Sequence, residues 1–191
     1  MEVKPELLKE LINGSRKAQR ELFDMFYKPM MRVSRIYCTN DDDAKSIVLE
    51  AFMDVFNNIE KFDGKASFKT WFNKIVVNRA LNQYRKNKKI AQREPALEPL
   101  MMQERFDAGE EGSDIIQKIT ADEILIVIQT LPETERLVFT LYVIEDYAHK
   151  DIAQELGFSE PTSRWHYSNA RKRLQEKLKM YHITSISHVN A

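Results

Sequence analysis

Apolar residues recur every three or four positions along much of this chain, which predicts a protein built mainly from helices. The most regular stripe predicts a helix that opens at Asp41-Asp42-Asp43, where negative charge suits a helix N-terminus. Leu49 and Met53 fall outside this stripe, beside Glu50 and Asp54, and indicate either a docking surface or a wider core. The stripe itself comprises Ala44, Ile47, Val48, Ala51, Phe52, Val55, Phe56 and Ile59.

The flanking segments are also predicted to be helical. Residues 6 to 37 form two helices in this interpretation, with a break at Asn13-Gly14-Ser15 and Ser15 as the cap of the second helix. Phe62 to Ser67 is expected to be a loop, with Gly64 as its turn residue, and Ser67 can cap the next helix. The buried face of that helix is predicted to hold Phe68, Trp71, Phe72 and Ile75.

Another face of the same helix mixes cations with amides. It comprises Lys74, Asn78, Asn82, Arg85 and Lys89. Basic faces with aromatic neighbours hold unpaired bases, and stacking contributes about 1–3 kcal/mol per base. For Phe68 and Trp71 the competing interpretation is a place in the core, which their spacing favours. Asn78 and Asn82 lie one turn apart beside a basic run, which favours a function.

Periodicity is lost between residues 90 and 114, where prolines and glycines predict a flexible linker. A second helical domain is expected over residues 115–180. Its first helix has an apolar face from Ile115 to Leu131, and Pro132 fits the first turn of the next helix. That next helix is predicted to bury Leu137, Val138, Leu141 and Tyr142. The expected fold is therefore all-α, with two small domains, residues 6–89 and 115–180, joined by a linker.

The stretch from Asp151 to Leu174 has the pattern of a DNA-binding helix-turn-helix. Gly157 suits the left-handed conformation at the end of the first helix, and Ser159 can cap the second. Arginine recognises guanine edges and asparagine recognises adenine. The side chains left to reach DNA are Arg164, His166, Ser168, Asn169, Arg171 and Lys172. A solvated basic helix face is the competing interpretation, and Arg173 is expected to meet phosphates or solvent.

Charge and composition narrow the choice of function. The net charge is zero, but residues 61 to 93 carry ten Lys or Arg and one Asp, whereas residues 94 to 123 carry nine Asp or Glu and two basic residues. This division predicts one surface for phosphates and a separate segment that avoids them. The single cysteine, Cys38, fits a buried position in a reducing compartment. No signal-peptide pattern or membrane-length apolar run occurs, so a cytoplasmic protein without membrane insertion is expected.

Signals of enzymatic chemistry are weak. The sequence contains no phosphate-binding loop, dinucleotide loop, zinc spacing or nucleophile elbow. Asp146 and His149 could share a metal, but a surface histidine near a helix start is the preferred interpretation. We therefore expect no enzyme, no metal site and no cofactor.

Four motifs in this order resemble bacterial RNA polymerase sigma factors of the extracytoplasmic-function type. They are the helix from Asp43 to Phe52, the helix from Phe68 to Asn78, the Leu131-Pro132 start and the recognition helix up to Leu174. The resemblance covers roughly residues 10 to 87 and 115 to 180. It implies a factor that brings core RNA polymerase to promoter DNA and that commonly has an anti-sigma partner.

The resemblance also implies three sets of site residues. Polymerase docking falls on Leu49, Glu50, Met53 and Asp54. Capture of the minus-ten promoter element falls on Phe62, Lys65, Lys74, Asn78, Asn82 and Arg85. Readout of the minus-thirty-five element falls on Arg164, His166, Ser168, Asn169, Arg171 and Lys172. Lys45 and Ser46, where the family usually has acidic residues, are departures, as are Trp165 and Asn169.

Two other functions compete with this one. A stand-alone helix-turn-helix regulator would bind its operator tightly without polymerase, as a dimer on spaced half-sites. An adaptor for RNA or single strands would use the first domain and leave the helix-turn-helix idle. The candidate docking residues of the first domain, Leu49 and Met53, and the face from Lys74 to Lys89 argue against the regulator.

Overall fold

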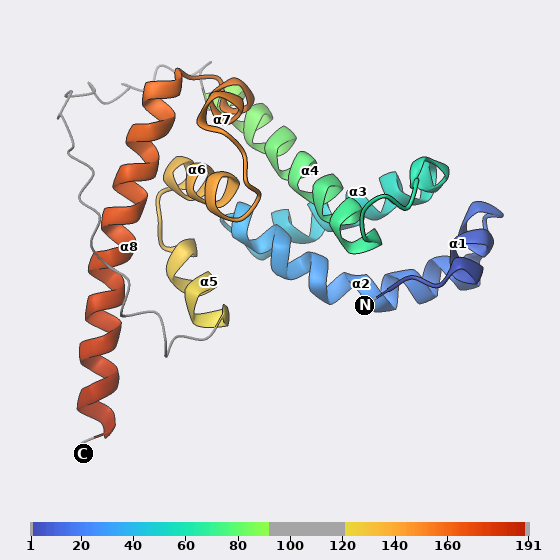
Figure 1. Ribbon diagram of the computed structural model, residues 1–191, viewed down its shortest axis with the longest axis horizontal. Helices are drawn as coiled ribbons and strands as arrows, with labels where there is room; N and C mark the ends of the chain where they lie inside the picture. Colours follow the sequence, from blue (N-terminus) through green and yellow to red (C-terminus); the bar gives the residue numbers. More distant parts are fainter. Residues whose placement is uncertain (1, 92–120, 190–191) are drawn as a thin grey trace. The chain divides into compact units, whose positions relative to one another are not determined.

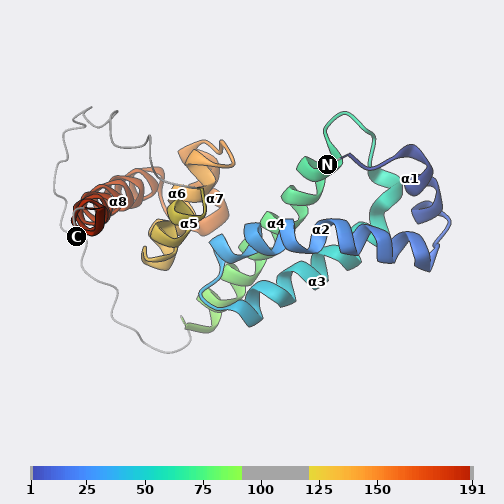
Figure 2. The ribbon, with the colours of Figure 1, turned by 90° about the horizontal axis from the view of Figure 1, so that it is seen from below.

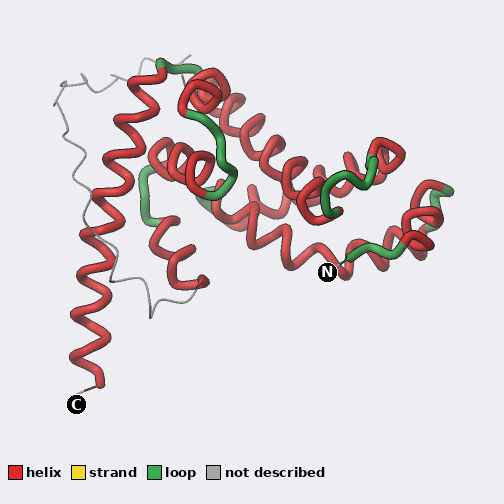
Figure 3. The backbone as a smooth tube through the Cα atoms, viewed as in Figure 1, coloured by secondary structure: helices red, strands yellow, loops and turns green. Residues whose placement is uncertain are grey.

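The computed structural model describes residues 2–91 and 121–189, and the regular structure in these ranges is helical, without strands (Figure 1, Figure 3). The expected all-α fold class is confirmed. The chain divides into two compact units, Met1–Lys89 and Ile90–Ala191. Within the described ranges, no helix combines the length and the apolar character needed to cross a membrane.

The helices of the first unit are α1 (Pro5–Ile12), α2 (Arg16–Tyr37), α3 (Asp41–Asn58) and α4 (Phe68–Ala91), with a 3-10 turn, η1, over Ile59–Lys61. Helices α2 and α3 lie side by side in both views of the ribbon (Figure 1, Figure 2). Helix α4 continues two residues past the expected boundary at 89, and the rest of the predicted linker, 92–114, lies outside the described residues, as do 115–120.

Side-chain caps fix where these helices begin. Ser15 Oγ accepts a hydrogen bond from the backbone N–H of Ala18, as the sequence predicted. Asn40, which was not predicted as a cap, begins α3 by accepting from the N–H of Asp43 at 2.8 Å. The three aspartates that follow lie in the first turn of α3, where they favour the positive end of the helix dipole.

Aromatic rings form the centre of the first unit. Phe52 of α3 and Phe72 of α4 meet edge to face with centroids 4.8 Å apart, and Phe26 of α2 lies 5.3 Å from Phe68. The predicted stripe of α3 is buried except for Phe56, which is half-buried. On α4, however, the buried face is wider than predicted, because Val76, Val77, Ala80 and Leu81 are buried while Trp71 and Ile75 are half-buried.

Helix α2 contains a proline in its interior. Pro29 lies between the buried residues Phe26 and Met30, and the helix continues through it to Tyr37. A proline has no N–H to donate, and its ring crowds the preceding turn, so the helix is weakened at this point. Tertiary contacts on both sides of Pro29 therefore stabilise α2.

The second unit contains α5 (Ala121–Gln129), α6 (Glu133–Val143), α7 (His149–Leu156) and α8 (Glu160–Val189). Helix α8 is the longest and packs against both α6 and α7. Pro132 occupies the N-cap position of α6 rather than its first turn, and Tyr142, which the sequence predicted to be buried, is exposed. Helix α8 also runs beyond the expected domain end at 180.

Candidate functional site

The second face of α3 presents two large apolar side chains to solvent. Leu49 is 51% exposed and Met53 is 58% exposed, although the stripe on the other side of the helix is buried. This exposure excludes the interpretation in which the two residues widen the core. Two exposed apolar side chains one turn apart on the same helix form a candidate interaction surface.

The carboxylates beside these residues are held by an arginine, Arg79, that was not among the site residues predicted from the sequence. Arg79 of α4 donates Nε–H and Nη2–H to the two oxygens of Asp54, and its Nη1–H to Glu50 at 2.9 Å. These contacts raise the pKa of the Arg79 guanidinium above its ordinary value, and the hydrogen bond to Asp54 makes the largest contribution. The carboxylate of Asp54 is thus bound within the unit. The one sequence feature that could have indicated a contact by Arg79 is its position next to Ala80, at the margin of the buried face of α4.

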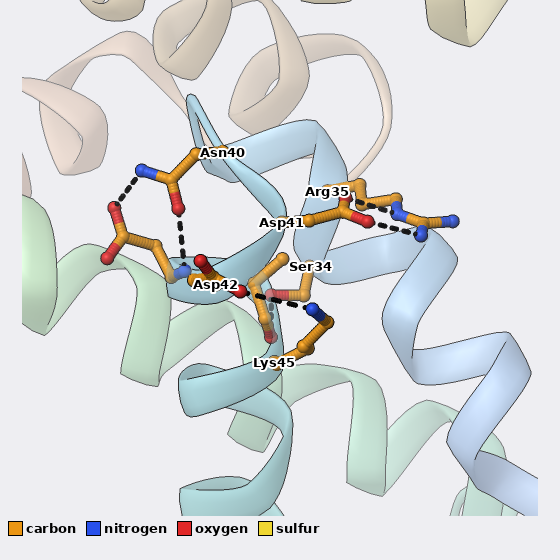
Figure 4. A network of polar contacts seen from close by, with 8 residues as sticks. Ser34, Arg35, Asn40, Asp41, Asp42 and Lys45 are labelled. Atoms are coloured by element: carbon orange, nitrogen blue, oxygen red, sulfur yellow. Dashed lines mark hydrogen bonds and ion pairs between the residues drawn. The ribbon is translucent and has the colours of Figure 1, made fainter.

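The opening of α3 holds a separate network of polar contacts (Figure 4). Arg35, near the end of α2, binds both oxygens of Asp41 at 2.9 and 2.8 Å, and this hydrogen bonding lowers the pKa of the Asp41 carboxyl. Lys45, one of the departures from the family pattern, pairs with Asp42 at 3.1 Å. The ammonium of Lys45 is therefore directed to its own helix, where its hydrogen bond to Asp42 raises its pKa.

Phe62, at the start of the loop before α4, is anchored by rings of that helix. Its centroid lies 5.2 Å from that of Phe68 and 5.4 Å from that of Trp71, and both Phe62 and Trp71 are half-buried. Gly64 has the positive φ, 73°, that a turn at this point requires. Lys65 Nζ lies 2.9 Å from Asp63, and the hydrogen bond from Lys65 lowers the pKa of that carboxyl.

The cations and amides predicted on α4 do share an exposed face. Lys74, Asn78, Asn82 and Arg85 are all exposed, at intervals of three and four residues. Arg85 donates a hydrogen bond from Nη2 to the amide oxygen of Asn82 at 2.6 Å. This bond engages the amide oxygen of Asn82 and not its NH₂ group.

The turn between α7 and α8 has the geometry expected of a helix-turn-helix. Gly157 adopts the left-handed conformation at φ 72°, and its N–H donates to the carbonyl of Ala153 at 3.0 Å. Ser159 accepts from the N–H of Thr162 at 3.3 Å and so caps α8. Ile152, Ala153 and Leu156 are buried, as predicted from their spacing.

The candidate DNA residues of α8 divide between two faces. Arg164, Ser168, Arg171 and Lys172 follow helical spacing along one exposed or half-buried stripe. His166 projects from another face and packs against Phe158, with ring centroids 5.5 Å apart. Arg164 is itself paired with Glu160 one turn earlier, at 2.7 Å. The remaining candidate, Asn169, is half-buried beside the buried Ala170.

His149 is not the surface histidine that the sequence predicted. It is buried, its Nδ1 lies 2.9 Å from the hydroxyl of Ser163, and its ring stacks on Tyr142 at 4.3 Å. Burial first, and then the charge of Arg164, lower the pKa of the imidazole. No group of three or more potential metal ligands lies among the described residues.

Arg173 has a structural partner rather than only solvent or phosphate. Its Nε lies 3.0 Å from the carboxylate of Glu135 on α6, a side chain that is 8% exposed. Burial raises the pKa of Glu135, and the charge of Arg173 opposes that shift. The neighbouring Arg136 is buried too and donates to the carbonyl of Gln129 at the end of α5.

Comparison with known proteins identifies both units. Residues 22–90 match the family model of sigma-70 region 2, and residues 121–174 match that of sigma-70 region 4. The first match covers α3, the loop and most of α4, and the second covers the helix-turn-helix up to Leu174. The chain therefore belongs to the sigma-70 family of transcription initiation factors. More narrowly, it is a sigma factor of the extracytoplasmic-function (ECF) type, which directs RNA polymerase to promoters.

Relatives of this type match over most of the chain. An ECF RNA polymerase sigma-E factor from Haemophilus influenzae is 26% identical over 186 residues, which is 90% of this chain and 93% of that protein. The ECF RNA polymerase sigma factor SigW of Bacillus subtilis is 24% identical over 187 residues, 90% and 95% of the two chains. A solved structure of the sigma factor RpoE with the anti-sigma factor NepR from Bartonella quintana aligns with a TM-score of 0.47 at 20% identity, over 84% of this chain and 96% of that one.

Proposed function

We propose that the three candidate surfaces divide the work of promoter-specific initiation between them. The exposed face of α3 docks on core RNA polymerase, the loop and α4 capture the minus-ten element, and α8 reads the minus-thirty-five element. The observation that carries this proposal is the exposure of Leu49 and Met53 on a helix whose other apolar residues are buried. A folded protein retains such a surface when a partner covers it.

Docking through α3 rests on apolar contact more than on charge. Leu49 and Met53 offer the exposed apolar area, and Glu50, with a side chain 58% exposed, provides a carboxylate at its edge. Asp54 belongs to this surface in position, but its carboxylate is engaged by Arg79. We therefore assign Asp54 a supporting role.

Capture of the minus-ten strand uses the amides and cations of α4. Asn78 and Asn82 expose amides that can bind base edges, whereas Lys74, Lys65 and Arg85 supply charge for phosphates. Phe62 contributes a half-buried ring at the start of the loop on which an unpaired base can stack.

Readout of the minus-thirty-five element uses the stripe of Arg164, Ser168, Arg171 and Lys172 on α8. This stripe starts at the capped N-terminal end of the helix, the part that enters the major groove in helix-turn-helix proteins. Asn169 lies at the margin of this stripe, and we assign it a contact there. His166 projects from another face of α8, so we assign it no central contact in the readout.

The setting of the protein is part of the same proposal. We place the factor in the cytoplasm with the polymerase, without catalytic activity or a cofactor of its own, and under the control of an anti-sigma factor. Purification of the chain from its source under mild conditions, followed by identification of bound proteins, tests the last point. Recovery of a stoichiometric partner that blocks transcription supports it.

The decisive experiment is run-off transcription with core polymerase on a pool of genomic promoters, with and without this protein. We expect new start sites that require the protein, and weak duplex binding by the protein alone. Equal, tight promoter binding without polymerase would instead support the stand-alone regulator.

The docking surface is tested by Leu49→Asp, which places a charge on the proposed contact and is expected to abolish binding to core polymerase. Ile12→Asp is the matched control, because Ile12 is an equally exposed apolar residue, at 47%, on α1 of the same unit. Circular dichroism checks that both variants fold. Normal polymerase binding by Leu49→Asp would show that the docking surface lies elsewhere.

The promoter-melting surface is tested by Asn78→Ala and Asn82→Ala. We expect both to impair open-complex formation while leaving polymerase affinity unchanged. Asn87→Ala serves as the control, since Asn87 is an exposed amide of α4 outside the candidate face, bonded to Gln83. Permanganate reactivity of unpaired thymines measures the opening, and unchanged reactivity in both test variants would refute the assignment.

A further inference from the structure

Arg79 lies between the two candidate surfaces of the first unit. On α3 it binds Glu50 and Asp54, each of which directly follows one of the exposed apolar residues Leu49 and Met53. On α4 it directly follows Asn78. The backbone of Arg79 therefore lies next to the candidate minus-ten surface, and its guanidinium lies next to the candidate docking surface.

The chemistry of this contact fixes direction as well as distance. Arg79 uses both edges of its planar guanidinium, with two N–H groups on Asp54 and a third on Glu50 one turn earlier along α3. A fork that grips acceptors on successive turns resists both sliding and rotation of α4 against α3. A lysine, whose ammonium is a point charge, cannot reproduce this restraint.

Stability alone does not account for the pair. The Arg79 side chain is 35% exposed and that of Asp54 is 30% exposed, so solvent screens much of the attraction. The two helices are already held by the buried contact between Phe52 and Phe72. To this contact in the core the ion pairs add a second, hydrogen-bonded contact at the surface, which defines the register of the two helices.

We infer that Arg79 is a positioning residue, which sets α4 in register with α3 so that docking on polymerase also orients the minus-ten surface. This inference rests on the proposed function, because it takes the docking and melting surfaces from there. The expected consequence is that Arg79 acts on promoter opening after the polymerase has bound.

The test compares holoenzymes carrying Arg79→Ala and Arg79→Lys with wild type at saturating concentration, after the active fraction of each has been titrated. We expect open complexes to form about tenfold more slowly in both variants, within the range of coupling found between contacting residues, with core affinity changed by less than about twofold. The exchange Asp54→Arg with Arg79→Asp keeps the opposite charges and is expected to restore part of the rate. A loss of folded protein would lower the active fraction and not the rate at saturation.

The matched control is Arg35→Ala, because Arg35 also grips both oxygens of an aspartate across two helices of this unit, at the α2–α3 junction (Figure 4). It should open promoters at the wild-type rate. The inference would be overturned if Arg79→Lys formed open complexes at the wild-type rate. It would also be overturned if the Arg79 variants lost core affinity by the same factor as the rate of open-complex formation. Normal core binding by Leu49→Asp would overturn the docking assignment instead, so the two failures are distinguishable.

Discussion

The two units of this sigma factor are held together by different kinds of contact. The first has a core of packed aromatic rings, and besides two tyrosines, Tyr37 and Tyr84, Ser34 is the one polar side chain buried in its described part. The second buries five polar or charged side chains within its described residues: Glu135, Arg136, Thr140, His149 and Ser163. Apolar packing depends on volume, whereas buried polar groups depend on partners and on protonation. The two units should therefore respond to different perturbations.

Polar contacts of the second unit lie at both ends of the stripe on α8 that is proposed to bind the minus-thirty-five element. Ser163, which contacts His149, directly precedes Arg164, and Arg173, which pairs with Glu135, directly follows Lys172. Helix α8 is thus tied to α7 at one end of this surface and to α6 at the other. Directional contacts at both ends fix its rotation, which apolar contacts alone would leave less restrained.

The largest effect is expected from Phe72→Ala, which leaves a cavity in the aromatic core. We expect a loss of about 3–5 kcal/mol in the free energy of unfolding of the first unit, with the second unaffected. The two tryptophans make this measurable by denaturant titration, because Trp71 reports on one unit and Trp165 on the other. The control Ile12→Ala should stay near wild type, and an equal shift at Trp165 would mean that the units unfold together.

Next in size is Arg173→Ala, which leaves the buried Glu135 carboxylate without its arginine. We expect the second unit to lose about 1–3 kcal/mol at neutral pH. Burial raises the pKa of Glu135, so acidification through that raised pKa protonates the carboxyl in the folded state and the loss shrinks. Lys172→Ala, an exposed neighbour, is the control. A loss that grows on acidification would contradict this account.

A smaller effect is expected from His149, whose contribution to the stability of the second unit should change with pH in the direction opposite to that of Glu135. Because the folded pKa of His149 is lowered, the unfolded chain binds a proton below about pH 6.5 that the folded unit refuses. Stability falls as the pH drops through this window, by at most about 1.4 kcal/mol per pH unit, and recovers above it. His149→Gln should flatten this slope in the Trp165 signal. An unchanged slope would assign it to another group, and the Trp71 signal is the internal control.

The smallest effect on stability is expected from Glu160→Gln, which removes the partner of Arg164. An exposed pair one turn apart on a helix contributes about 0.3–0.5 kcal/mol, so melting should hardly change. The freed guanidinium should nevertheless bind minus-thirty-five DNA more tightly, with a steeper dependence on salt. Arg164→Ala is the comparison, and weaker DNA binding by Glu160→Gln would show that the ion pair itself orients the arginine.

Local patterns predicted those features that depend on a single helix or turn. The apolar stripe of α3, the cap at Ser15 and the left-handed Gly157 all follow from residues within a few positions of one another, and the structure has each of them. The sequence left open whether Leu49 and Met53 belong to the core or to a docking surface. Their exposure in the structure, with the other apolar face of α3 buried, excludes the core.

Contacts between distant segments were the part that the sequence did not predict. Arg79 lies 25 residues from Asp54, and its pairing depends on how α4 crosses α3. His149 is buried by segments distant in sequence, since Tyr142 stacks on its ring and the hydroxyl of Ser163, 14 residues away, lies against its Nδ1. Val76, Val77 and Ala80 were missed for a related reason, since α4 packs on more than one neighbour and its buried face is wider than one stripe.

The interior proline of α2 has a consequence for synthesis on the ribosome. A proline inside a helix costs about 3 kcal/mol because it gives no hydrogen bond to the preceding turn, so the segments before and after Pro29 have little tendency to form one continuous helix by themselves. The segment after Pro29 depends on tertiary contacts to continue the helix. Its buried residues gain their contacts from α3, as when Ser34 donates to the carbonyl of Ala44 at 3.0 Å. The nascent chain should therefore stay open until α3 has left the exit tunnel. The first unit is then expected to assemble late and cooperatively, rather than helix by helix as it emerges.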